Sequence, residues 1–422
     1  MIVDWQTLGM ASGAILLGAA GLRAAGAAYG STRRARAARL RFVDRQKTFA
    51  QRLEGTMQWA TATRPAFKAW SAARPFRVAG VVQESQDCKS YYLTPVDGRP
   101  LPRFEPGQYL TFHLPIDPRQ QPLVRCYSLS ERPREDYYRV TIKQMAAPVG
   151  QADILPGQGS GYFHKQIKVG STLEVQAPQG AFFLDPTNQL PVVLVGGGIG
   201  ITPVLSMANS IAHERSSREV YLFAGFGNSS EQPFHENFSE FTEQDNIHTD
   251  ISYSRPMPAD QIGRNYDHRG HVDISRLKEV LPSNNYCFYV CGPPGMMENL
   301  VPALREWGVP DKHIGYEAFG PASVKGLRDG EQHQLGTQPC EVDFSISEKS
   351  CHWNGEHQSL LELAESEGVV LDYGCRAGNC GQCLVTVQQG QVAHVKEPGV
   401  PLSKDECLTC IGIPQSDVQV QA

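Results

Sequence analysis

The sequence predicts a multidomain protein of mixed α+β and α/β class, in which an antiparallel β-barrel, a parallel α/β domain and a small mixed domain follow an N-terminal helix. Short runs of alternating apolar and polar residues, separated by Gly and Pro, fill residues 76–186 and indicate the barrel. Strand-like and helix-like runs alternate through residues 191–318 around a glycine-rich turn. Near the C-terminus, a nine-residue stretch contains three of the 11 cysteines.

The N-terminal segment has the length of a membrane span. Residues 8–30 carry one charge, Arg23, and an arginine-rich stretch, residues 33–41, follows directly. The positive-inside rule would then leave the remaining chain in the cytoplasm. We expect residues 1–31 to form a single transmembrane or interfacial anchor and residues 32–74 a basic helical linker. A soluble helical arm is the alternative, because Ala and Gly drive membrane insertion weakly.

Charge is distributed unevenly along the chain. Residues 31–77 contain 12 Lys and Arg against 2 Asp and Glu, a balance of +10, whereas residues 340–422 contain 4 against 12, a balance of −8. The basic segment suits anionic lipid headgroups rather than nucleic acid. The acidic segment would steer a basic partner protein, or is a solvated face. The cysteines lack a secreted disulfide pattern, which again favours the cytoplasmic side.

The barrel region, residues 75–188, contains the run RCYSLS from Arg125 to Ser130. This run resembles the R-x-Y-S motif of the ferredoxin–NADP reductase superfamily. The resemblance implies that Arg125 binds a flavin phosphate, that Tyr127 lies against the isoalloxazine, and that Ser128 reaches the flavin N5 edge. An ordinary strand with a buried tyrosine is the alternative.

A second motif, GQGSGYFH from Gly157 to His164, follows about 30 residues later in what reads as a β context. The resemblance implies that Gly159, Ser160 and the neighbouring amides hold the cofactor's pyrophosphate. The region looks closest to FAD-binding members of the superfamily. FAD is therefore the expected flavin.

Residues 189–319 contain GGGIG between the apolar run PVVLV and a predicted helix from Thr202 onward. A glycine-rich turn before a helix is suited to a dinucleotide pyrophosphate, because amides and helix dipole face the anion. The G-x-G-x-x-G fingerprint is absent, since Ile201 stands where the third Gly is required. A tight turn without a ligand is the alternative. The candidate binding residues of this turn are Gly196, Gly197, Gly198, Gly200 and Thr202.

Two further runs complete the resemblance to the reductase family, YVCGPPGMM and YEAFGPAS. It implies that Cys291, followed by Gly292 and Pro293, lies beside the nicotinamide. It also implies that Glu317 and Phe319 lie near the flavin and nicotinamide. The alternatives are a buried small hydrophobe for the cysteine and a surface carboxylate for the glutamate. The candidate catalytic residues are Ser128, Cys291 and Glu317.

The choice between NADH and NADPH depends on the residues after the second strand of this domain. That stretch, Phe226–Ser230, contains no basic residue to bind a 2′-phosphate. Arg255 is close enough in sequence to supply the charge. The pattern favours NADH slightly.

The cysteines from Cys375 to Cys383 have C-x4-C-x2-C spacing, which is the signature of a plant-type 2Fe–2S cluster. Zinc is the alternative, but its ligands usually form C-x2-C pairs far apart. Residues 340–422 resemble a plant-type ferredoxin of β-grasp fold. The resemblance makes Cys410 the fourth ligand and leaves Cys407 as a bystander. The expected metal ligands are Cys375, Cys380, Cys383 and Cys410.

A polar, glycine-rich linker, residues 320–339, separates the last two domains. We expect an NAD(P)H-dependent iron–sulfur flavoprotein that converts two-electron donation into one-electron transfer. Its partner would be an oxygenase, a hydroxylase or a desaturase. The alternatives are a reductase of a quinone or another electron carrier, and a redox-sensing protein without turnover.

Overall fold

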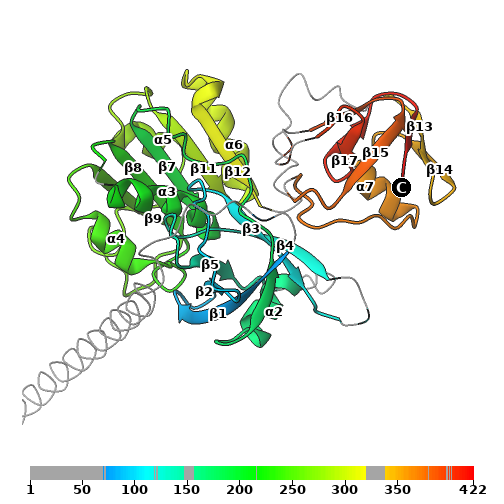
Figure 1. Ribbon diagram of the computed structural model, residues 1–422. Coiled ribbons are helices and arrows are strands. Elements are labelled where there is room, and N and C mark those ends of the chain that lie inside the picture. Colours follow the sequence, from blue (N-terminus) through cyan, green and yellow to red (C-terminus); the bar gives the residue numbers. More distant parts are fainter. Residues whose placement is uncertain are drawn as a thin grey trace, which may run out of the picture. The chain divides into compact units, whose positions relative to one another are not determined.

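The computed structural model describes residues 70, 73–117, 119, 122–146, 156–214, 216–319, 338–378, 380–395, 398, 400 and 402–422 (Figure 1). The predicted anchor, residues 1–31, lies outside the described residues, as do nearly all of the predicted basic linker and residues 320–337 of the second linker. In the described part of the chain, no helix has both the length and the apolar character needed to cross a membrane. Residues Ala66–Ala422 form one compact unit.

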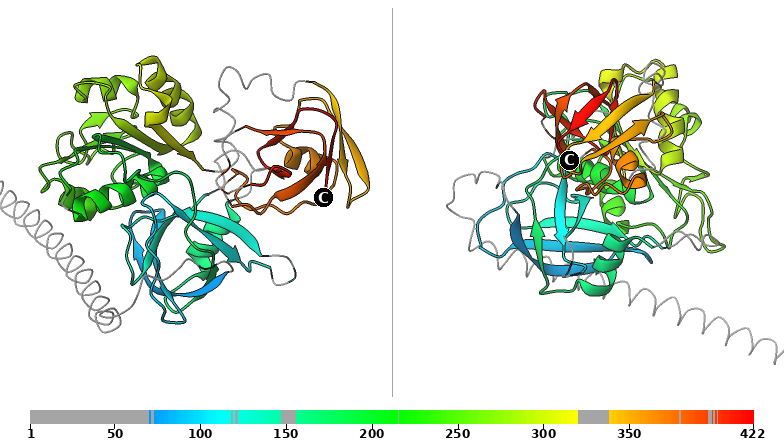
Figure 2. Two further views of the ribbon diagram at one scale, coloured as in Figure 1. Left: turned by 45° about the horizontal axis from the view of Figure 1, so that its top comes forward. Right: turned by 90° about the vertical axis from the view of Figure 1, so that its right-hand side faces the viewer.

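The first sheet has six strands in the order β4-β3-β6-β1-β2-β5, and every pair is antiparallel. Its strands are β1 (Arg74–Gln83), β2 (Cys88–Pro95), β3 (Tyr109–Leu114), β4 (Leu123–Ser128), β5 (Tyr138–Lys143) and β6 (Thr172–Val175). An isolated bridge joins Leu129, just after β4, to Val140 in β5. The sheet therefore curls until its two edges meet, as the further views show (Figure 2).

The core of the first sheet explains its alternating pattern. Phe76 and Val78, two residues apart on β1, are fully buried beside Tyr91, Phe112 and Phe163. Phe163 comes from helix α2 (Gln158–Gln166), which covers the end of this core. The motif GQGSGYFH therefore forms a helix within its β context, between β5 and β6, and the sequence analysis did not predict this helix. Its glycines disfavour a helix locally, and packing of the aromatic side chain outweighs that preference.

The second sheet is parallel, with the strand order β10-β9-β8-β7-β11-β12. Its strands are β7 (Val192–Gly197), β8 (Val220–Phe226), β9 (Ile247–Tyr253), β10 (His268–Arg269), β11 (Cys287–Gly292) and β12 (Ile314–Ala318). Its helices are η1 (Gly198–Gly200), α3 (Ile201–His213), α4 (His235–Phe241), α5 (Ile274–Val280), α6 (Pro294–Glu306) and η2 (Asp311–His313).

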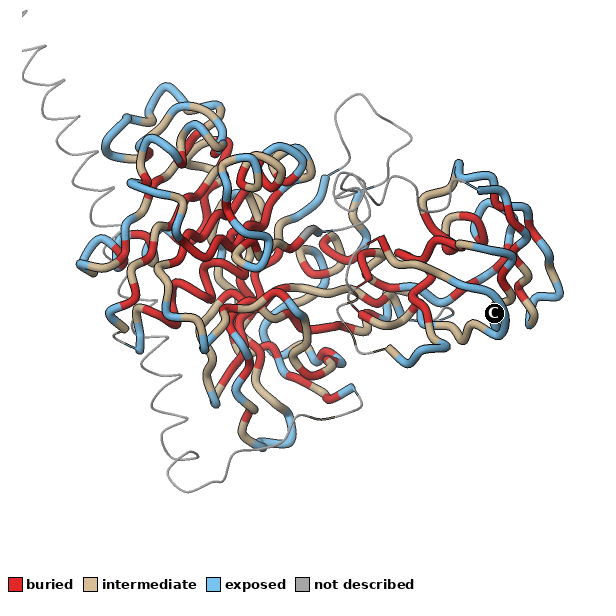
Figure 3. The backbone as a smooth tube through the Cα atoms, turned by 90° about the horizontal axis from the view of Figure 1, so that it is seen from above, coloured by how far each residue is buried: buried red, intermediate tan, exposed pale blue. Residues whose placement is uncertain are grey.

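The central strand β7 is buried at every residue, which is typical of a parallel sheet covered on both faces. Its alternate residues belong to two cores, with Val192 and Leu194 packed with α3 and α4, and Val193 and Val195 packed with α5 and α6. Figure 3 shows the buried positions gathered in the interior and the exposed positions at the periphery. The chain reverses its direction of winding at β7, between β8 and β11. Ligands of such sheets bind at the carboxyl ends of the strands at this point.

The third sheet is mixed, with the order β14-β13-β19-β15-β17. Its strands are β13 (Cys340–Phe344), β14 (Lys349–Trp353), β15 (Leu384–Gln389), β17 (Glu406–Leu408) and β19 (Val418–Val420), and β16 (Val392–His394) pairs with β18 (Gly412–Pro414). The first and last strands lie side by side in parallel. Helix α7 (Leu360–Ser366) packs its leucines into the same core, and the Ser359 hydroxyl caps it by accepting the Glu362 N–H at 3.2 Å.

Candidate functional site

The two predicted flavin motifs meet in space. A Cβ atom built on Gly159, in the first turn of α2, would lie 2.9 Å from Arg125 Cγ and 2.9 Å from Tyr127 Oη. Gly159 is therefore the residue that lets α2 approach β4. Burial raises the pKa of Tyr127, so its phenol stays protonated. Residues of the two motifs thus form one cradle with a guanidinium, an aromatic ring and a helix start, which fits a flavin nucleotide.

The polar side chains of Arg125 and Ser160 in these motifs already form hydrogen bonds within the protein. The Arg125 Nη1 donates to the carbonyls of Val124 at 2.8 Å and of Gly374 at 3.1 Å. The Ser160 hydroxyl donates to the Gly157 carbonyl and accepts the Met145 N–H, both at 3.1 Å. The hydroxyl of Ser160 thus fastens its own turn, and amides at the start of α2 are left as the groups suited to phosphate.

The glycine-rich turn after β7 packs against the turn after β11. A Cβ on Gly200 would lie 2.4 Å from the Cys291 carbonyl oxygen, and one on Gly197 would lie 2.7 Å from Pro293 Cδ. Gly198 has φ +53° and no heavy atom within 4 Å of its Cβ position, so its side of the turn is open. Such an open, glycine-rich turn at the start of α3 fits a pyrophosphate.

Three more candidate residues, Gly196 and Thr202 of the first turn and Gly292 at the end of β11, lie at the same place. Gly196 is in close contact with the start of α3, since a Cβ built on it would lie 2.8 Å from Ile201 Cα. Gly292 packs under Met296, with a Cβ position 2.2 Å from the methyl carbon Cε. Thr202 is buried and its hydroxyl donates to the Ile199 carbonyl at 2.9 Å, so it closes the turn.

Cys291 and Glu317 are neighbours on adjacent parallel strands, where they are register partners. Both are buried. Burial and the charge of Glu317 raise the pKa of the Cys291 thiol, so it stays protonated. Ser128 is buried at the end of β4, and Phe319 is 38% exposed just after β12.

A residue that the sequence analysis did not identify, Tyr109, lies between these groups and the cysteine loop. It is the register partner of Ser128 on β3. Burial raises its pKa, and so do the charges of Cys126, Cys375 and Glu317 around its hydroxyl. A buried aromatic residue of the first sheet is thus influenced by charges from the second sheet and from the cysteine loop. Its only sequence signal is an aromatic residue opposite the R-x-Y-S motif in a predicted hairpin.

The cysteine loop directs backbone N–H groups at sulfur atoms. Cys375 N donates to Cys380 Sγ at 3.2 Å, Cys380 N donates to Cys375 Sγ at 3.3 Å, and Gly378 N donates to Cys410 Sγ at 3.3 Å. Positive φ angles of 53° at Arg376 and 70° at Gly378 turn the amides inward. Four cysteines with amide donors fit an iron–sulfur cluster, whose sulfur atoms accept such hydrogen bonds.

Cys383 and Cys410 are free cysteines whose thiol groups interact with each other. A hydrogen bond from the Cys410 thiol lowers the pKa of Cys383, although burial opposes it. Cys407 differs from both, because it is buried in β17 as the register partner of Val385, and burial raises its pKa to about 12. The geometry is consistent with Cys410 as the fourth ligand and Cys407 as a core residue.

A fifth thiol, which the sequence analysis also did not identify, lies at the cysteine loop. The sulfur atoms of Cys126, Cys375 and Cys380 all lie within 4.8 Å of one another. Hydrogen bonds with Cys375 and Cys380, together with burial, raise the pKa of Cys126. The signal in the sequence was the cysteine at the variable position of R-x-Y-S.

Two carboxylates, Glu231 in the loop after β8 and Asp260 after β9, lie near this loop, and Lys143 and Arg255 lie beside Glu231. Arg255 Nη2 lies 3.3 Å from the Glu231 carboxylate, and the Ser229 N–H donates to the Asp260 carboxylate at 3.4 Å. The arginine that was available for a 2′-phosphate is thus beside a carboxylate.

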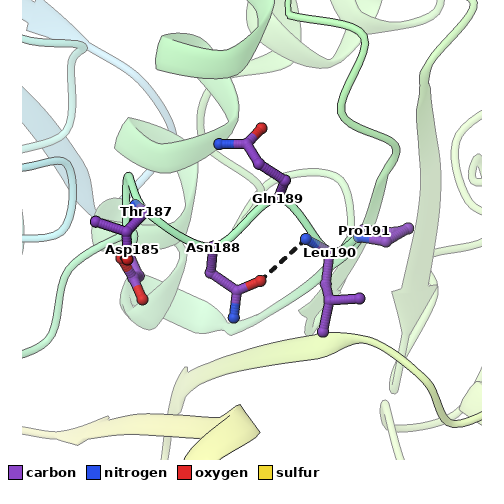
Figure 4. Close-up of a pocket in the computed structure, with 6 residues that line it drawn as sticks. All are labelled: Asp185, Thr187, Asn188, Gln189, Leu190 and Pro191. Atoms are coloured by element: carbon purple, nitrogen blue, oxygen red, sulfur yellow. Dashed lines mark hydrogen bonds between the residues drawn. The ribbon is translucent and has the colours of Figure 1, made fainter.

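An open pocket of about 590 Å³ lies along the segment that joins the first two sheets (Figure 4). It is lined by Asp185, Thr187, Asn188, Gln189, Leu190 and Pro191. Asn188 Oδ1 accepts the Leu190 N–H there at 3.0 Å. No predicted site residue lines this pocket, and we assign it no role in electron transfer.

Comparison with known protein families covers all three sheets. Residues 76–184 match the oxidoreductase FAD-binding domain, residues 194–301 the oxidoreductase NAD-binding domain, and residues 346–415 the 2Fe–2S iron-sulfur cluster binding domain. The last match rules against the zinc alternative for the cysteine loop. The cofactors are FAD, NAD(P)H and a 2Fe–2S cluster.

Curated relatives match the first two domains. The flavohemoprotein of Halalkalibacterium halodurans is 36% identical over 256 residues, which are 60% of this chain and 62% of that protein. The flavohemoprotein of Rhodopirellula baltica is 36% identical over 270 residues, 64% of this chain and 65% of that protein. The chain therefore spans less than two thirds of the length of these relatives.

Solved structures extend the likeness. The FAD/NAD-binding domain of nitric oxide dioxygenase from Vibrio cholerae is 29% identical with a TM-score of 0.53, covering 60% of this chain and all of that one. Phthalate dioxygenase reductase has the same fold at 23% identity and a TM-score of 0.52, covering 83% of this chain and 98% of that one. The chain thus combines, in this order, an oxidoreductase FAD-binding domain, an oxidoreductase NAD-binding domain and a 2Fe–2S cluster binding domain, which is the domain content of ferredoxin–NADP-reductase-like reductases with a C-terminal ferredoxin domain.

Proposed function

We propose that this electron-transfer reductase serves a partner oxygenase, hydroxylase or desaturase, to which it passes electrons from NAD(P)H through FAD and the 2Fe–2S cluster. Support comes from the likeness over nearly the whole length of phthalate dioxygenase reductase, a protein described as transferring electrons from pyridine nucleotides to a 2Fe–2S centre. The proposed domains are a FAD-binding β-barrel at 75–188, an NAD(P)-binding domain at 189–319 and a β-grasp ferredoxin domain at 340–422.

The observation that carries the proposal is the contact between the flavin motif and the cysteine loop. Arg125 of β4 donates to the carbonyl of Gly374, the residue before the first cluster cysteine, although 249 positions separate them. An electron leaving the flavin cradle would therefore cross a short, protein-filled path to the cluster loop.

The three bound groups would supply hydride donation, flavin oxidation and reduction, and one-electron storage. The protein's own residues bind and orient them in this proposal. Amides at the start of α2 and Arg125 hold the FAD phosphates, and the turn from Gly196 to Gly200 holds the NAD(P)H pyrophosphate. Ser128, Cys291 and Glu317 surround the place where the nicotinamide would meet the flavin, and their burial excludes water from it.

We further propose that the donor is NADH. Glu231 and Asp260 place two carboxylates in the loop region where a 2′-phosphate would be recognised, and Arg255 is beside the first of them. Arg255 and Lys143 both lie beside Glu231, so a phosphate dianion brought to this place would compete with that carboxylate for them. Comparing kcat/KM for NADH and NADPH tests this, and a strong NADPH preference would contradict it.

The proposed function is tested by measuring NADH oxidation with two acceptors, cytochrome c and ferricyanide, in the parent protein and in Cys380→Ser. The parent should reduce both acceptors rapidly. The variant, with a cluster ligand removed, should lose cytochrome c reduction and keep ferricyanide reduction through the flavin.

Negligible turnover with both acceptors would favour a redox-sensing role instead. Capture of the acceptor from membranes with the full-length chain then distinguishes an oxygenase, hydroxylase or desaturase from a quinone reductase complex or another electron carrier. The same fractionation tests whether the predicted anchor at residues 1–31 attaches the protein to a membrane, by comparison with a chain that starts near residue 70.

A further inference from the structure

Strand β4 contacts the cysteine loop through three successive residues. A Cβ on Gly374 would lie 3.0 Å from Val124 Cγ1, and Arg125 donates to the Gly374 carbonyl at 3.1 Å. Cys126 follows, with its sulfur within 4.8 Å of the sulfurs of Cys375 and Cys380. The loop therefore lies on β4 where a thiol of the first domain approaches two cluster ligands.

The position of Cys126 is fixed by the sheet rather than by the loop. Cys126 is the register partner of Thr111 on β3, whose Oγ1 lies 3.4 Å from its sulfur. Its neighbours on β4 are the flavin-motif residues Arg125 and Tyr127. Because both sides are held, the thiol cannot leave the loop without movement of the two domains.

We propose that Cys126 is a positioning residue for the cluster, whose thiol donates its one hydrogen bond to the ligand sulfur of Cys375 or Cys380 and thereby raises the cluster's reduction potential. This inference rests on the proposed function. A hydrogen-bond donor at a ligand sulfur stabilises the reduced cluster more than the oxidised one, because the reduced form carries one more negative charge. The four cysteines of the ferredoxin domain already complete the ligand set, which leaves the Cys126 S–H as a neighbouring donor rather than a fifth ligand.

The consequence is that the cluster's potential depends on the flavin domain. When the loop lies on β4, the donor is present and the cluster is a better electron acceptor. When the loop leaves β4, the donor is lost and the cluster becomes a stronger reductant for the next protein. Docking of the loop on the flavin domain would thus favour reduction of the cluster, and its release would favour oxidation of the cluster by the next protein.

The experiment is a redox titration of the full-length protein, followed by electron paramagnetic resonance of the reduced cluster and by flavin absorbance. The variants are Cys126→Ala, which removes the donor, and Cys126→Ser, which replaces it with a hydroxyl. Cys88→Ala is the matched control, because Cys88 is a buried thiol of the same domain on β2.

We expect Cys126→Ala to lower the equilibrium constant for cluster reduction about tenfold, a shift of 59 mV for one electron, and to leave the flavin potential unchanged. Cys126→Ser should recover most of the shift, and Cys88→Ala should show none. The resonance spectrum of the Cys126→Ala cluster should also change, since a ligand sulfur has lost a neighbour.

An unchanged cluster potential and spectrum in Cys126→Ala would overturn the inference while leaving the proposed function intact. Loss of the cluster from both Cys126 variants would also overturn it, because Cys126 would then be a ligand. Absence of a cluster signal from the parent protein after anaerobic reconstitution would contradict the proposed function, and this inference with it.

Discussion

Replacing Gly200 by alanine tests the packing that builds the nicotinamide site. The added Cβ would lie 2.4 Å from the carbonyl oxygen of Cys291, 2.6 Å from its carbon and 2.7 Å from the Gly292 nitrogen. All three neighbours are backbone atoms, so no side-chain rotation relieves the contact. Either the turn after β7 or the end of β11 must move, and both carry candidate binding residues.

Adding one methyl group to a well-packed interior lowers the free energy of unfolding by about 1–3 kcal/mol. In a domain of this size, 1 kcal/mol changes the melting temperature by roughly 4 °C, so Gly200→Ala should lower it by roughly 4–12 °C. Gly295→Ala is the matched control. It lies in α6 of the same domain with no heavy atom within 4 Å of its Cβ position, and alanine is favoured over glycine in a helix by about 1 kcal/mol.

The assay is thermal unfolding of each full-length variant by circular dichroism, combined with titration of NADH binding. Absorbance of the flavin and of the cluster reports whether the other two domains are intact. Gly200→Ala should melt earlier and bind NADH more weakly with both absorbances retained, whereas Gly295→Ala should melt at the parent temperature or above. If Gly200→Ala melts like the control and binds NADH like the parent, the close approach of the two turns is not what shapes the site.

Three other predictions follow from single contacts. Cys410→Ser should lose the cluster's visible absorption after anaerobic reconstitution, whereas Cys407→Ala should keep it; the opposite pattern would exchange their roles. Asp260→Asn should raise kcat/KM for NADPH relative to NADH, because a carboxylate near the 2′ position is removed, and an unchanged ratio would count against the proposed NADH preference. A hydrogen bond from Arg74 lowers the pKa of Asp97 in the folded protein. The pair therefore stabilises the fold at pH values above the unfolded-state pKa near 4, and this stabilisation is lost as the pH falls through the lowered folded-state pKa. Asp97→Asn should flatten the acid side of the plot of unfolding free energy against pH, measured by urea unfolding.

The sequence predicted those parts of the site that depend on neighbouring residues. The turn from Gly196 to Gly200 was found because its glycines, the preceding apolar run and the following helix are contiguous. The cysteine loop was found because its spacing alone is specific. Helix α2 was missed because Gly159 and its neighbouring glycines are poor helix formers, and the preference for helix arises only when Phe163 packs into the core of the first sheet.

Residues brought together by the packing of separate domains had no comparable signal. Tyr109 and Cys126 meet the cluster ligands across more than 240 positions of sequence, as the 249-residue separation of Arg125 and Gly374 illustrates. No periodicity or spacing records such a contact. Both residues read as ordinary strand positions, and only the register of β3 with β4 and the contact with the loop distinguish them.

Arg125 shows how one side chain can serve two of these sites together. The predicted role was phosphate binding, and the structure places its Nη1 on the carbonyls of Val124 and Gly374. These uses are compatible, because a guanidinium has five N–H donors in a planar fork and Nη1 supplies only two of them. The remaining donors, on Nη2 and Nε, suffice for a phosphate. An FAD phosphate bound there would fix the guanidinium plane, and the fixed plane would in turn hold the Gly374 carbonyl. Flavin binding and docking of the cluster loop are then coupled through a single residue, so the loop would dock most firmly on a flavin domain that contains its cofactor.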